Sequence, residues 1–249
     1  MKKFPIAERF TSPQGEGLYA GTLMYFIRFA GCSVGKKLSD SERRGWEQKI
    51  DHFHSKENEL LAVYTEKCCT YDGREFLCDT DFRTKEALTM KELLDGIPKG
   101  VGHICLTGGE PLNQPLSEFF DFIGSETDYK VHVETSGTVS MEDTWPEYTA
   151  ADSLEAWHEG GWLWITVSPK KGLLSEMIGI ANEIKLLVDE NFDVEKIPDD
   201  IKDHRLVWLQ PINTEFEVDR RNLDRCLSLL QEHKNWRLSS QMHKTWRVR

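Results

Sequence analysis

Four of the six cysteines lie in or beside one polar stretch of this 249-residue chain: Cys32, Cys68, Cys69 and Cys78. Six cysteines are too few for a disulfide scaffold in a chain of this length, whereas a cluster of thiolates can bind metal. Three thiolates converging from loops at the end of a strand could hold a four-iron cluster with one iron left open. They could also hold a zinc ion completed by a histidine such as His52 or His54. The spacing does not decide, because the short C-x-x-C signature is absent.

The other two cysteines fall where buried residues are expected. Cys105 lies in an apolar run typical of a strand. Cys226 lies on the apolar side of an expected helix, together with Leu223, Leu227 and Leu230. We therefore expect both to be core thiols without a chemical role.

Short apolar runs alternate with helical segments along the chain. Such alternation is typical of α/β proteins, and near-continuous apolar runs are typical of parallel strands covered on both faces. We expect helices over residues 89–95, 115–123 and 219–232. We expect strands over residues 23–29, 103–107, 131–135, 162–167, 183–188 and 206–210.

Unusual residues follow four of these expected strands directly. They are residues 107–111 (TGGEP), 134–138 (ETSGT), 168–170 (SPK) and 210–211 (QP). The carboxyl ends of parallel strands meet at one edge of a sheet or one mouth of a barrel, and active sites gather there. We therefore expect these four segments to share one site.

One segment interrupts the alternation. Residues 33–77 contain 8 Lys/Arg and 9 Asp/Glu, so 17 of 45 residues are charged, or 38% against 29% for the chain. We interpret 33–77 as an insertion in the loop after the first expected strand, with a solvent-facing helix over 39–61. The remaining residues, roughly 200, suit a single domain over residues 1–249, in the form of an abbreviated barrel.

Charge and hydropathy exclude several classes of function. The formal net charge is -11, and broad nucleic-acid binding needs clustered Lys and Arg, so we expect no direct nucleic-acid partner. No run of 18 apolar residues occurs, so we expect no membrane span. No signal-peptide core follows Lys2 and Lys3, and we expect a cytoplasmic protein.

Nine short motifs follow one another in a specific order along the chain. They are residues 10–17 (FTSPQGEG), 26–32 (FIRFAGC), 78–82 (CDTDF), 107–111 (TGGEP), 134–137 (ETSG), 167–170 (VSPK), 182–185 (NEIK), 209–212 (LQPI) and 236–239 (WRLS). The set resembles the 7-carboxy-7-deazaguanine synthase family of radical S-adenosylmethionine (SAM) enzymes, from about residue 8 to the C-terminus. The resemblance implies a partial TIM-like βα barrel of the radical SAM type.

The cysteine motif departs from the family pattern. Radical SAM enzymes usually carry C-x3-C-x2-C, and members of this family are known with a lengthened first gap. If Cys78 is the last ligand of a 4Fe–4S cluster and Cys32 the first, the usual middle position is Glu75. The middle ligand would then be Cys68 or Cys69, giving C-x35-C-x9-C or C-x36-C-x8-C. Adjacent side chains of an extended segment point opposite ways, so we expect one of the two to bind iron.

The resemblance places the SAM site at the strand ends. Gly108 and Gly109 would let the backbone approach SAM closely, and Glu110 would accept a hydrogen bond from its amino group. An ordinary glycine turn is the alternative for the Gly-Gly pair. Lys170 could also be a solvated lysine beside Lys171. The further residues expected on the SAM side are Glu134, Ser136, Ser168, Lys170 and Gln210.

The implied substrate is 6-carboxy-5,6,7,8-tetrahydropterin, a flat heterocycle with one carboxylate. Arg28 lies in an apolar strand, where it could form an internal salt bridge or clamp that carboxylate. His243 lies in a basic stretch, residues 231–249, with 5 Lys/Arg against one Asp/Glu, and is a candidate contact unless this stretch is simply solvated. The residues expected at the pterin edge are Pro13, Gln14, Gly15, Glu16 and Thr107.

The resemblance further implies a Mg2+ ion with the Thr80 hydroxyl as its protein ligand. The neighbouring carboxylates of Asp79 and Asp81 need have no role in metal binding, because they could cap a turn or pair with Arg83. An external electron donor such as a flavodoxin or ferredoxin, and a homodimer, are also implied.

The implied reaction is a ring contraction in which no side chain acts as nucleophile, acid or base. A 5'-deoxyadenosyl radical takes hydrogen from C6 of the pterin, the ring rearranges, hydrogen returns and ammonia leaves. The product, 7-carboxy-7-deazaguanine, is a 7-deazapurine of the kind used in queuosine biosynthesis and tRNA modification. SAM is thus a reusable cofactor.

Two other interpretations of the cysteines stay open. A radical SAM activase acting on a protein partner would need a protein-binding groove, and it would leave Gln14, Glu16 and Arg28 unexplained. A non-catalytic binding module stabilised by zinc would use Cys68, Cys69, Cys78 and a histidine of the insertion.

Overall fold

The computed structural model describes residues 2–42, 66–78, 80, 83–146, 161–213 and 218–246. Within them a nine-stranded sheet has the order β12-β11-β10-β9-β8-β7-β2-β1-β6, and all neighbours from β2 to β12 are parallel. Strands β1 and β6 add antiparallel pairs at one side. The strands are β1 Phe4–Pro13, β2 Leu23–Phe29, β6 Glu86–Leu88, β7 His103–Gly108, β8 Lys130–Thr135, β9 Leu163–Val167, β10 Glu183–Val188, β11 Val207–Pro211 and β12 Trp236–Leu238.

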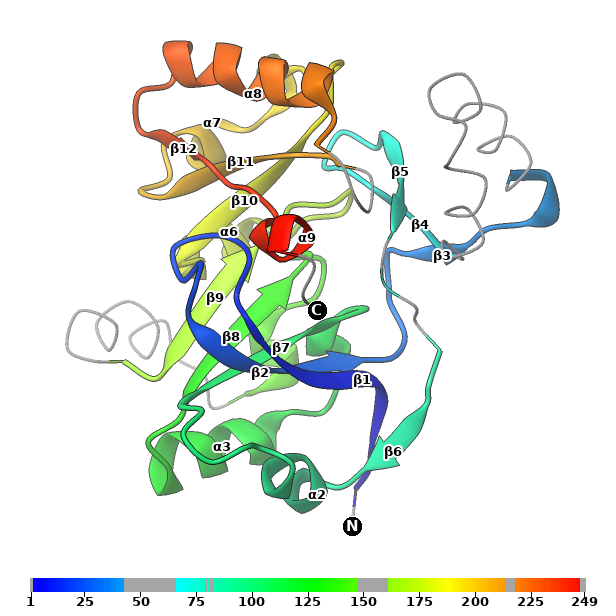
Figure 1. The fold of residues 1–249 in the computed structure, drawn as a ribbon, viewed down its shortest axis with the longest axis vertical. Coiled ribbons are helices and arrows are strands. Elements are labelled where there is room, and N and C mark those ends of the chain that lie inside the picture. Colours follow the sequence, from blue (N-terminus) through cyan, green and yellow to red (C-terminus); the bar gives the residue numbers. More distant parts are fainter. Residues whose placement is uncertain are drawn as a thin grey trace.

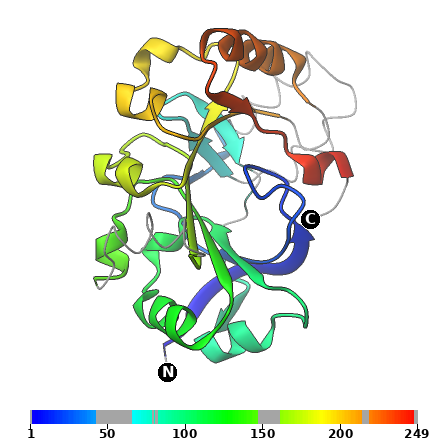
Figure 2. The ribbon, with the colours of Figure 1, turned by 90° about the vertical axis from the view of Figure 1, so that its left-hand side faces the viewer.

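The sheet curves, and helices cover its outer face (Figures 1 and 2). The described edges, β12 and β6, do not pair with each other, so the barrel is partial, as expected. Helix caps explain two helix starts: Thr89 forms a capping box at α2, and Asp219 accepts from two backbone N–H groups at α8. The helices are α2 Met90–Asp95, α3 Ser117–Glu126, α4 Met141–Thr144, α6 Ser175–Ile180, α7 Asp199–Lys202, α8 Arg220–Glu232 and α9 Met242–Trp246, with 3-10 turns η2 Pro111–Asn113 and η3 Val194–Lys196.

A second, three-stranded sheet stands apart from the barrel sheet. Its order is β3-β4-β5, with β3 at Lys36–Lys37, β4 at Glu66–Cys69 and β5 at Glu75–Cys78. Strands β4 and β5 form a hairpin in which Cys68 pairs with Phe76 and Glu66 with Cys78. In Figure 1 this hairpin lies beside the ends of β10 and β11. We call β4, β5 and their turn the cysteine hairpin.

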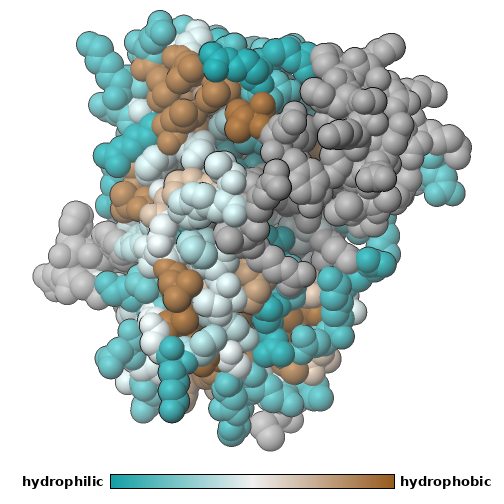
Figure 3. Space-filling model, in the orientation of Figure 1, coloured by the Kyte–Doolittle hydropathy of each residue, from teal (hydrophilic) through white to brown (hydrophobic). Residues whose placement is uncertain are grey.

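The main core lies between the sheet and the helices on its outer face. It contains buried residues of β7 to β11 together with Phe119 and Phe120 of α3 and Leu229 of α8. A smaller group, Met24, Phe26 and Cys105, forms a separate buried cluster. On the face seen in Figure 3, apolar residues gather in separate groups among hydrophilic ones. No helix in the described ranges is both long enough and apolar enough to cross a bilayer.

The expected strands and helices are present: the strands over 23–29 and 183–188 have the expected bounds, and the bounds of the other elements differ by at most three residues. Cys105 and Cys226 are buried, as expected. Leu227, however, is 39% exposed, and Leu229 takes its place on the buried side of α8, so that part of the expected apolar face was wrong.

The cysteine region also needs correction. The insertion follows the second strand, β2, because β1 precedes it, and Cys68 and Cys78 lie on strands where loops were expected. Residues 43–65, which include His52, His54 and most of the helix expected over 39–61, lie outside the described residues.

Candidate active site

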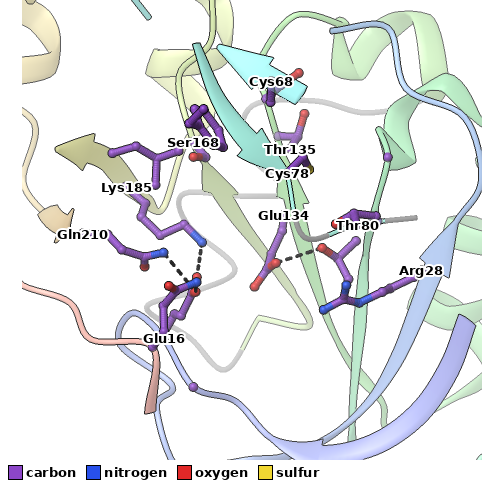
Figure 4. A pocket seen from close by; sticks show the side chains of 18 of the residues that line it. Glu16, Arg28, Cys68, Cys78, Thr80, Glu134, Thr135, Ser168, Lys185 and Gln210 are labelled. Atoms are coloured by element: carbon purple, nitrogen blue, oxygen red, sulfur yellow. Dashed lines mark hydrogen bonds and ion pairs between the residues drawn. The ribbon is translucent and has the colours of Figure 1, made fainter. Parts of the chain in front are cut away.

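One cavity at the carboxyl ends of the parallel strands collects most of the residues singled out from the sequence (Figure 4). Cys69 and Glu110 are absent from its described lining, and the side chain of His243, in α9, lies outside the described residues. The predicted site residues that line it are Pro13, Gln14, Gly15, Glu16, Arg28, Cys32, Cys68, Cys78, Thr80, Thr107, Gly108, Gly109, Glu134, Ser136, Ser168, Lys170 and Gln210.

Three half-buried thiols, Cys32, Cys68 and Cys78, face this cavity from two sides. Cys32 follows β2, whereas the other two lie on the cysteine hairpin. Burial raises the pKa of the Cys32 and Cys68 thiols, because it disfavours the charged thiolate. A bound metal centre would supply the positive charge that favours thiolates, so this set suits an iron–sulfur cluster. Within the described ranges, no three His, Cys, Asp or Glu residues are grouped as ligands of a single metal ion.

The Gly108-Gly109 turn packs against the segment that carries Cys32. The backbone N–H of Gly109 donates to the Phe29 carbonyl (3.0 Å), and that of Glu110 donates to the Gly31 carbonyl (3.1 Å). A Cβ atom on Gly109 would lie 1.7 Å from the Gly31 oxygen. The second glycine is therefore required for close approach of two chain segments, in addition to any approach to a ligand.

Glu110 is fully buried, and its carboxylate is engaged inside the protein. It accepts hydrogen bonds from Thr135 Oγ1 (2.8 Å), the Ser136 backbone N–H (2.9 Å), the Leu112 N–H (3.2 Å) and the Ser136 hydroxyl. In this structure Glu110 therefore fixes the turn after β8, which presents Ser136 to the cavity.

Lys170 places a buried amino group beside the cysteine hairpin. Its Nζ donates to the Ser168 hydroxyl (2.8 Å) and carbonyl (3.1 Å), and lies 5.8 Å from the centre of the Phe76 ring. Burial lowers the pKa of Lys170, while nearby Cys68 and Cys78 act in the opposite direction. Lys170 is 8% exposed, so it is not a solvated lysine.

Hydrogen bonds between polar side chains of the cavity wall join β7, β8 and the segment that follows β1. Glu134 Oε1 accepts from Gln14 Nε2 (3.0 Å), and its Oε2 accepts from Thr107 Oγ1 (2.9 Å). Gln14 Oε1 in turn accepts from the backbone N–H of Glu16 (3.2 Å). These bonds fix the carboxylate and amide that a polar ligand would meet.

Glu16 lies where three donors converge. Gln210 Nε2 and Gln241 Nε2 each donate to its Oε1 at 3.0 Å, and Lys185 pairs with its Oε2. Figure 4 shows Lys185 and Gln210 pointing to Glu16 across one side of the cavity. Burial alone would lower the pKa of Lys185, but the carboxylates of Glu16 and Glu134 raise it above its ordinary value.

Lys185 and Gln241 also line the cavity, although sequence reasoning did not assign them to the site. Lys185 carries the same signal that identified Arg28, a charge within an apolar strand. Gln241 carries no such signal, because it follows a three-residue strand that was not expected.

Arg28 stands over an aromatic pair on the side of the cavity opposite Lys185 (Figure 4). Phe10 and Phe26 stack with ring centres 5.0 Å apart, and Arg28 Cζ lies 5.5 Å from the Phe10 centre. Its Nε is buried and has no hydrogen-bond partner in the described part of the chain. A buried donor without a partner is costly, so this guanidinium is suited to receive an anion.

Thr80 lines the cavity two positions after Cys78, and it is 9% exposed. Its hydroxyl lies on the same side as Arg28 (Figure 4). A hydroxyl beside an anion-binding residue suits a hydrated Mg2+ ion bridged to substrate oxygens. Asp79 and Asp81 lie outside the described residues.

Comparisons with known proteins agree on one family, although no family model matches the chain. The 7-carboxy-7-deazaguanine synthase of Buchnera aphidicola subsp. Schizaphis graminum is 32% identical over 99% of both chains. The enzyme of the same name from Escherichia coli (strain K12) is 29% identical over 97% of both chains. The crystal structure of QueE from Escherichia coli superposes with a TM-score of 0.59 at 25% identity, covering 96% of this chain and 93% of that chain.

Proposed function

The chain belongs to the 7-carboxy-7-deazaguanine synthase family, and on that premise we propose that it converts 6-carboxy-5,6,7,8-tetrahydropterin to 7-carboxy-7-deazaguanine and ammonia. The observation that carries the proposal is one cavity lined by three thiols, by amide and carboxylate groups, and by Arg28, whose buried Nε has no hydrogen-bond partner among the described residues. The comparisons support a ring-contracting radical SAM enzyme, with a 4Fe–4S cluster and SAM as cofactors.

Cys32, Cys68 and Cys78 would hold the cluster, because these three line the cavity. When bound, the reduced cluster and SAM supply a 5'-deoxyadenosyl radical that can take a hydrogen atom from the substrate. The chain's own residues keep this reaction away from water and hold the substrate in place. Phe76 and Leu77 of the hairpin close the cavity on the cysteine side.

On the SAM side, polar groups at the ends of β7 to β9 and β11 would orient the cofactor. Gly108, Gly109, Ser136, Ser168, Lys170 and Gln210 all line this part of the cavity. Glu110 contributes indirectly, because its carboxylate fixes Ser136. Glu134 would serve SAM or the pterin, since it lies between Gln14 and Thr107.

On the substrate side, Arg28 would bind the pterin carboxylate through a charge-assisted pair. Gln14 and Glu16 would bind the pyrimidine edge, within a wall that includes Pro13, Gly15 and Thr107. His243 stays a candidate contact. We assign no residue of this wall as nucleophile, acid or base, because the bound cofactors would supply the hydrogen-atom chemistry and these side chains would position the substrate.

Several finer properties belong to the same proposal. Thr80 would bind Mg2+ together with substrate oxygens. The enzyme would act in the cytoplasm as a homodimer, draw electrons from a flavodoxin or ferredoxin, and supply a 7-deazapurine precursor for tRNA modification.

Anaerobic reconstitution with iron and sulfide tests the proposal. The protein should turn brown and, with SAM, reductant, Mg2+ and the carboxytetrahydropterin, release a product lighter by one ammonia. The Cys78→Ala variant is the control and should give no product. A fully loaded cluster without that product would reject the reaction, and a colourless protein with stoichiometric zinc would favour a binding module.

A further inference from the structure

The cysteine hairpin is attached to the barrel through its side chains. Its strands pair with each other and with β3, and the described residues show no strand pairing between this small sheet and the nine-stranded one. The turn between β4 and β5 is closed by the Thr70 N–H, which donates to the Arg74 carbonyl (2.9 Å). Contacts at this turn and along the inner face of the hairpin therefore help to set its place over the cavity.

Arg74, at the end of the turn, reaches from the hairpin to the barrel. Its Nη1 pairs with Asp189, which directly follows β10, and its Cζ lies 5.5 Å from the centre of the Phe192 ring. Its Nε donates to both carboxylate oxygens of Asp72 (2.9 and 2.8 Å), which keeps the guanidinium plane in place. The Arg74 and Asp189 side chains are 20% and 24% exposed, so solvent screens this pair less than a surface pair.

The hairpin's other described ion pairs do not make this connection. Lys67 bonds Glu75 on the paired strand (2.7 Å) and Glu42, which lies in the chain before β4. Two other contacts with the barrel are looser: Lys170 lies near the Phe76 ring, and Tyr71 packs against the main core. The Arg74–Asp189 pair is thus a charged, directional link between hairpin and barrel.

We propose that Arg74 is a positioning residue that holds Cys68 and Cys78 at the correct distance from Cys32 by tying the hairpin to Asp189. The inference rests on the proposed function, because three thiolates must meet one cluster. Cys68 and Cys78 lie on the hairpin, and Cys32 follows β2 of the barrel. The distance between hairpin and barrel therefore sets the distance between the cluster ligands. Without the Arg74–Asp189 pair, the hairpin would not be held in the position that cluster binding requires. The protein would then retain the cluster less firmly.

Removing either partner of the pair tests the link. Arg74→Ala and Asp189→Asn should each make the reconstituted protein lose iron to a chelator about five- to tenfold faster than the wild type, as fits a half-buried pair. The amide of Asp189→Asn keeps an Oδ1 acceptor for the Asn191 N–H, which bonds Asp189 at 2.8 Å. In the double variant the loss should be no faster than in Arg74→Ala alone, because Arg74→Ala already removes the pair with Asp189.

A matched arginine provides the control. Arg221 pairs with Glu190, the residue after Asp189, at 3.2 Å, and the Arg221→Ala variant removes that pair without touching the hairpin. Its iron should be lost at the wild-type rate. Equal rates in the wild type and both hairpin variants, additive effects in the double variant, or a comparable effect of Arg221→Ala would each overturn the inference.

A second measurement needs no cluster. In the reduced apo protein, the rate at which each cysteine reacts with iodoacetamide can be followed by mass spectrometry. Arg74→Ala should speed the reaction of Cys68 and Cys78 several-fold and leave buried Cys105 and Cys226 slow. Unchanged rates would reject the positioning role. A wild type that never acquires iron would instead count against the proposed function, so the two failures are distinguishable.

Discussion

Cys68 and Cys69 are neighbours in β4, and strand geometry turns their side chains to opposite faces of the hairpin. Cys68 lines the cavity together with Cys32 and Cys78, whereas Cys69 is absent from the described lining. A cluster ligand must reach the same space as its two partners. The geometry therefore favours Cys68 as the middle ligand, which corresponds to the spacing C-x35-C-x9-C.

We expect Cys68→Ala to abolish cluster assembly and Cys69→Ala to leave it intact. Each variant is reconstituted anaerobically, and bound iron, sulfide and the visible absorbance of the cluster are compared with the wild type. Both cysteines are half-buried, so Cys69→Ala also controls for the loss of a thiol from the same strand. Loss of the cluster in both variants, or in Cys69→Ala alone, would contradict the assignment.

Arg28 is expected to act on the substrate carboxylate. Charge-assisted hydrogen bonds contribute about 1.5 to 3 kcal/mol, so Arg28→Ala should lower kcat/KM for the pterin by roughly ten- to a hundredfold. The measurement that identifies the contact is binding of a tetrahydropterin without the carboxylate, which should be the same for variant and wild type. Arg9→Ala is the control, because Arg9 pairs with Glu86 (2.8 Å) outside the cavity lining. An equal loss with both ligands would indicate a structural role.

Sequence reasoning identified residues whose chemistry is out of place in their surroundings. Arg28 and Glu16 could be identified in this way. Arg28 is a charge within an apolar strand, where it requires a partner or a ligand, and Glu16 is a charge within a glycine-flanked turn. The direction of the Glu110 side chain could not be predicted, since it depends on the Thr135 and Ser136 donors of the neighbouring strand. The choice between Cys68 and Cys69 depended on which face of the cysteine hairpin is turned to the cavity. The sequence did not indicate the hairpin, so it could not indicate that face.

At the level of elements, the Gly108-Gly109 turn connects the end of β7 to the segment that carries Cys32. Gly109 packs against Gly31 and Cys32, and Gly108 adopts a φ of 110° where its Cβ would meet Phe29. The turn therefore fixes the segment that presents Cys32 as firmly as it shapes the end of β7. Shaping the end of β7 and holding the Cys32 segment both require the same close approach of the two segments, because both lie at the same edge of the barrel.

We expect Gly109→Ala to weaken both fold and cluster. The added Cβ would lie 1.7 Å from the Gly31 oxygen, so the two segments must separate. Overpacking of this kind costs about 1 to 3 kcal/mol, which urea unfolding of the apo protein should detect. Iron retention should fall as well, because Cys32 moves with Gly31. Gly102→Ala is the matched control, since a Cβ added there would meet no atom within 4 Å beyond its chain neighbours. Wild-type stability and iron content in Gly109→Ala would exclude this role.

The predictable elements were those whose residues are buried on both faces. Strands β7 to β11 are mostly apolar in sequence, because helices cover one face of each strand and the other face lies toward the barrel interior. Strand β1 was not expected, since Glu8 and Arg9 interrupt its apolar pattern near an irregularity in the β1–β2 register. The cysteine hairpin was not expected either, because β4 and β5 are short and contain charged residues.

At the scale of the whole molecule, the segment from Gln14 to Thr22 links the two sides of the partial barrel. It connects β1 and β2, yet Glu16 bonds Lys185 and Gln210 of the opposite strands. Glu183 accepts from the Leu18 N–H (3.0 Å) and from Trp208 Nε1 (2.8 Å). The Glu16 contacts in the cavity wall and the Glu183 contacts outside it thus both hold this segment against the opposite strands.

We expect a pair of histidines, His103 and His132, to make the overall stability depend on pH. His132 Nε2 lies 2.8 Å from His103 Nδ1, and the Tyr19 ring contacts the His132 ring at 4.5 Å between centres. Burial, and then the charges of His103 and Lys130, lower the pKa of His132 to about 3. An unfolded histidine titrates near 6.5, so below that pH the unfolded chain takes up a proton that the folded chain does not.

Stability should therefore be complete above pH 6.5 and fall as the pH drops toward 3. For His132 alone the loss between pH 7.5 and pH 5 is about 2 kcal/mol, and the lowered pKa of His103 acts in the same direction. Urea unfolding of the apo protein across this range measures it. His132→Gln removes the titrating group, so its unfolding free energy should change less with pH, whereas Tyr19→Phe keeps the ring and should retain the wild-type slope. A His132→Gln slope equal to that of the wild type would show that other groups control acid stability, because a glutamine side chain takes up no proton in either state.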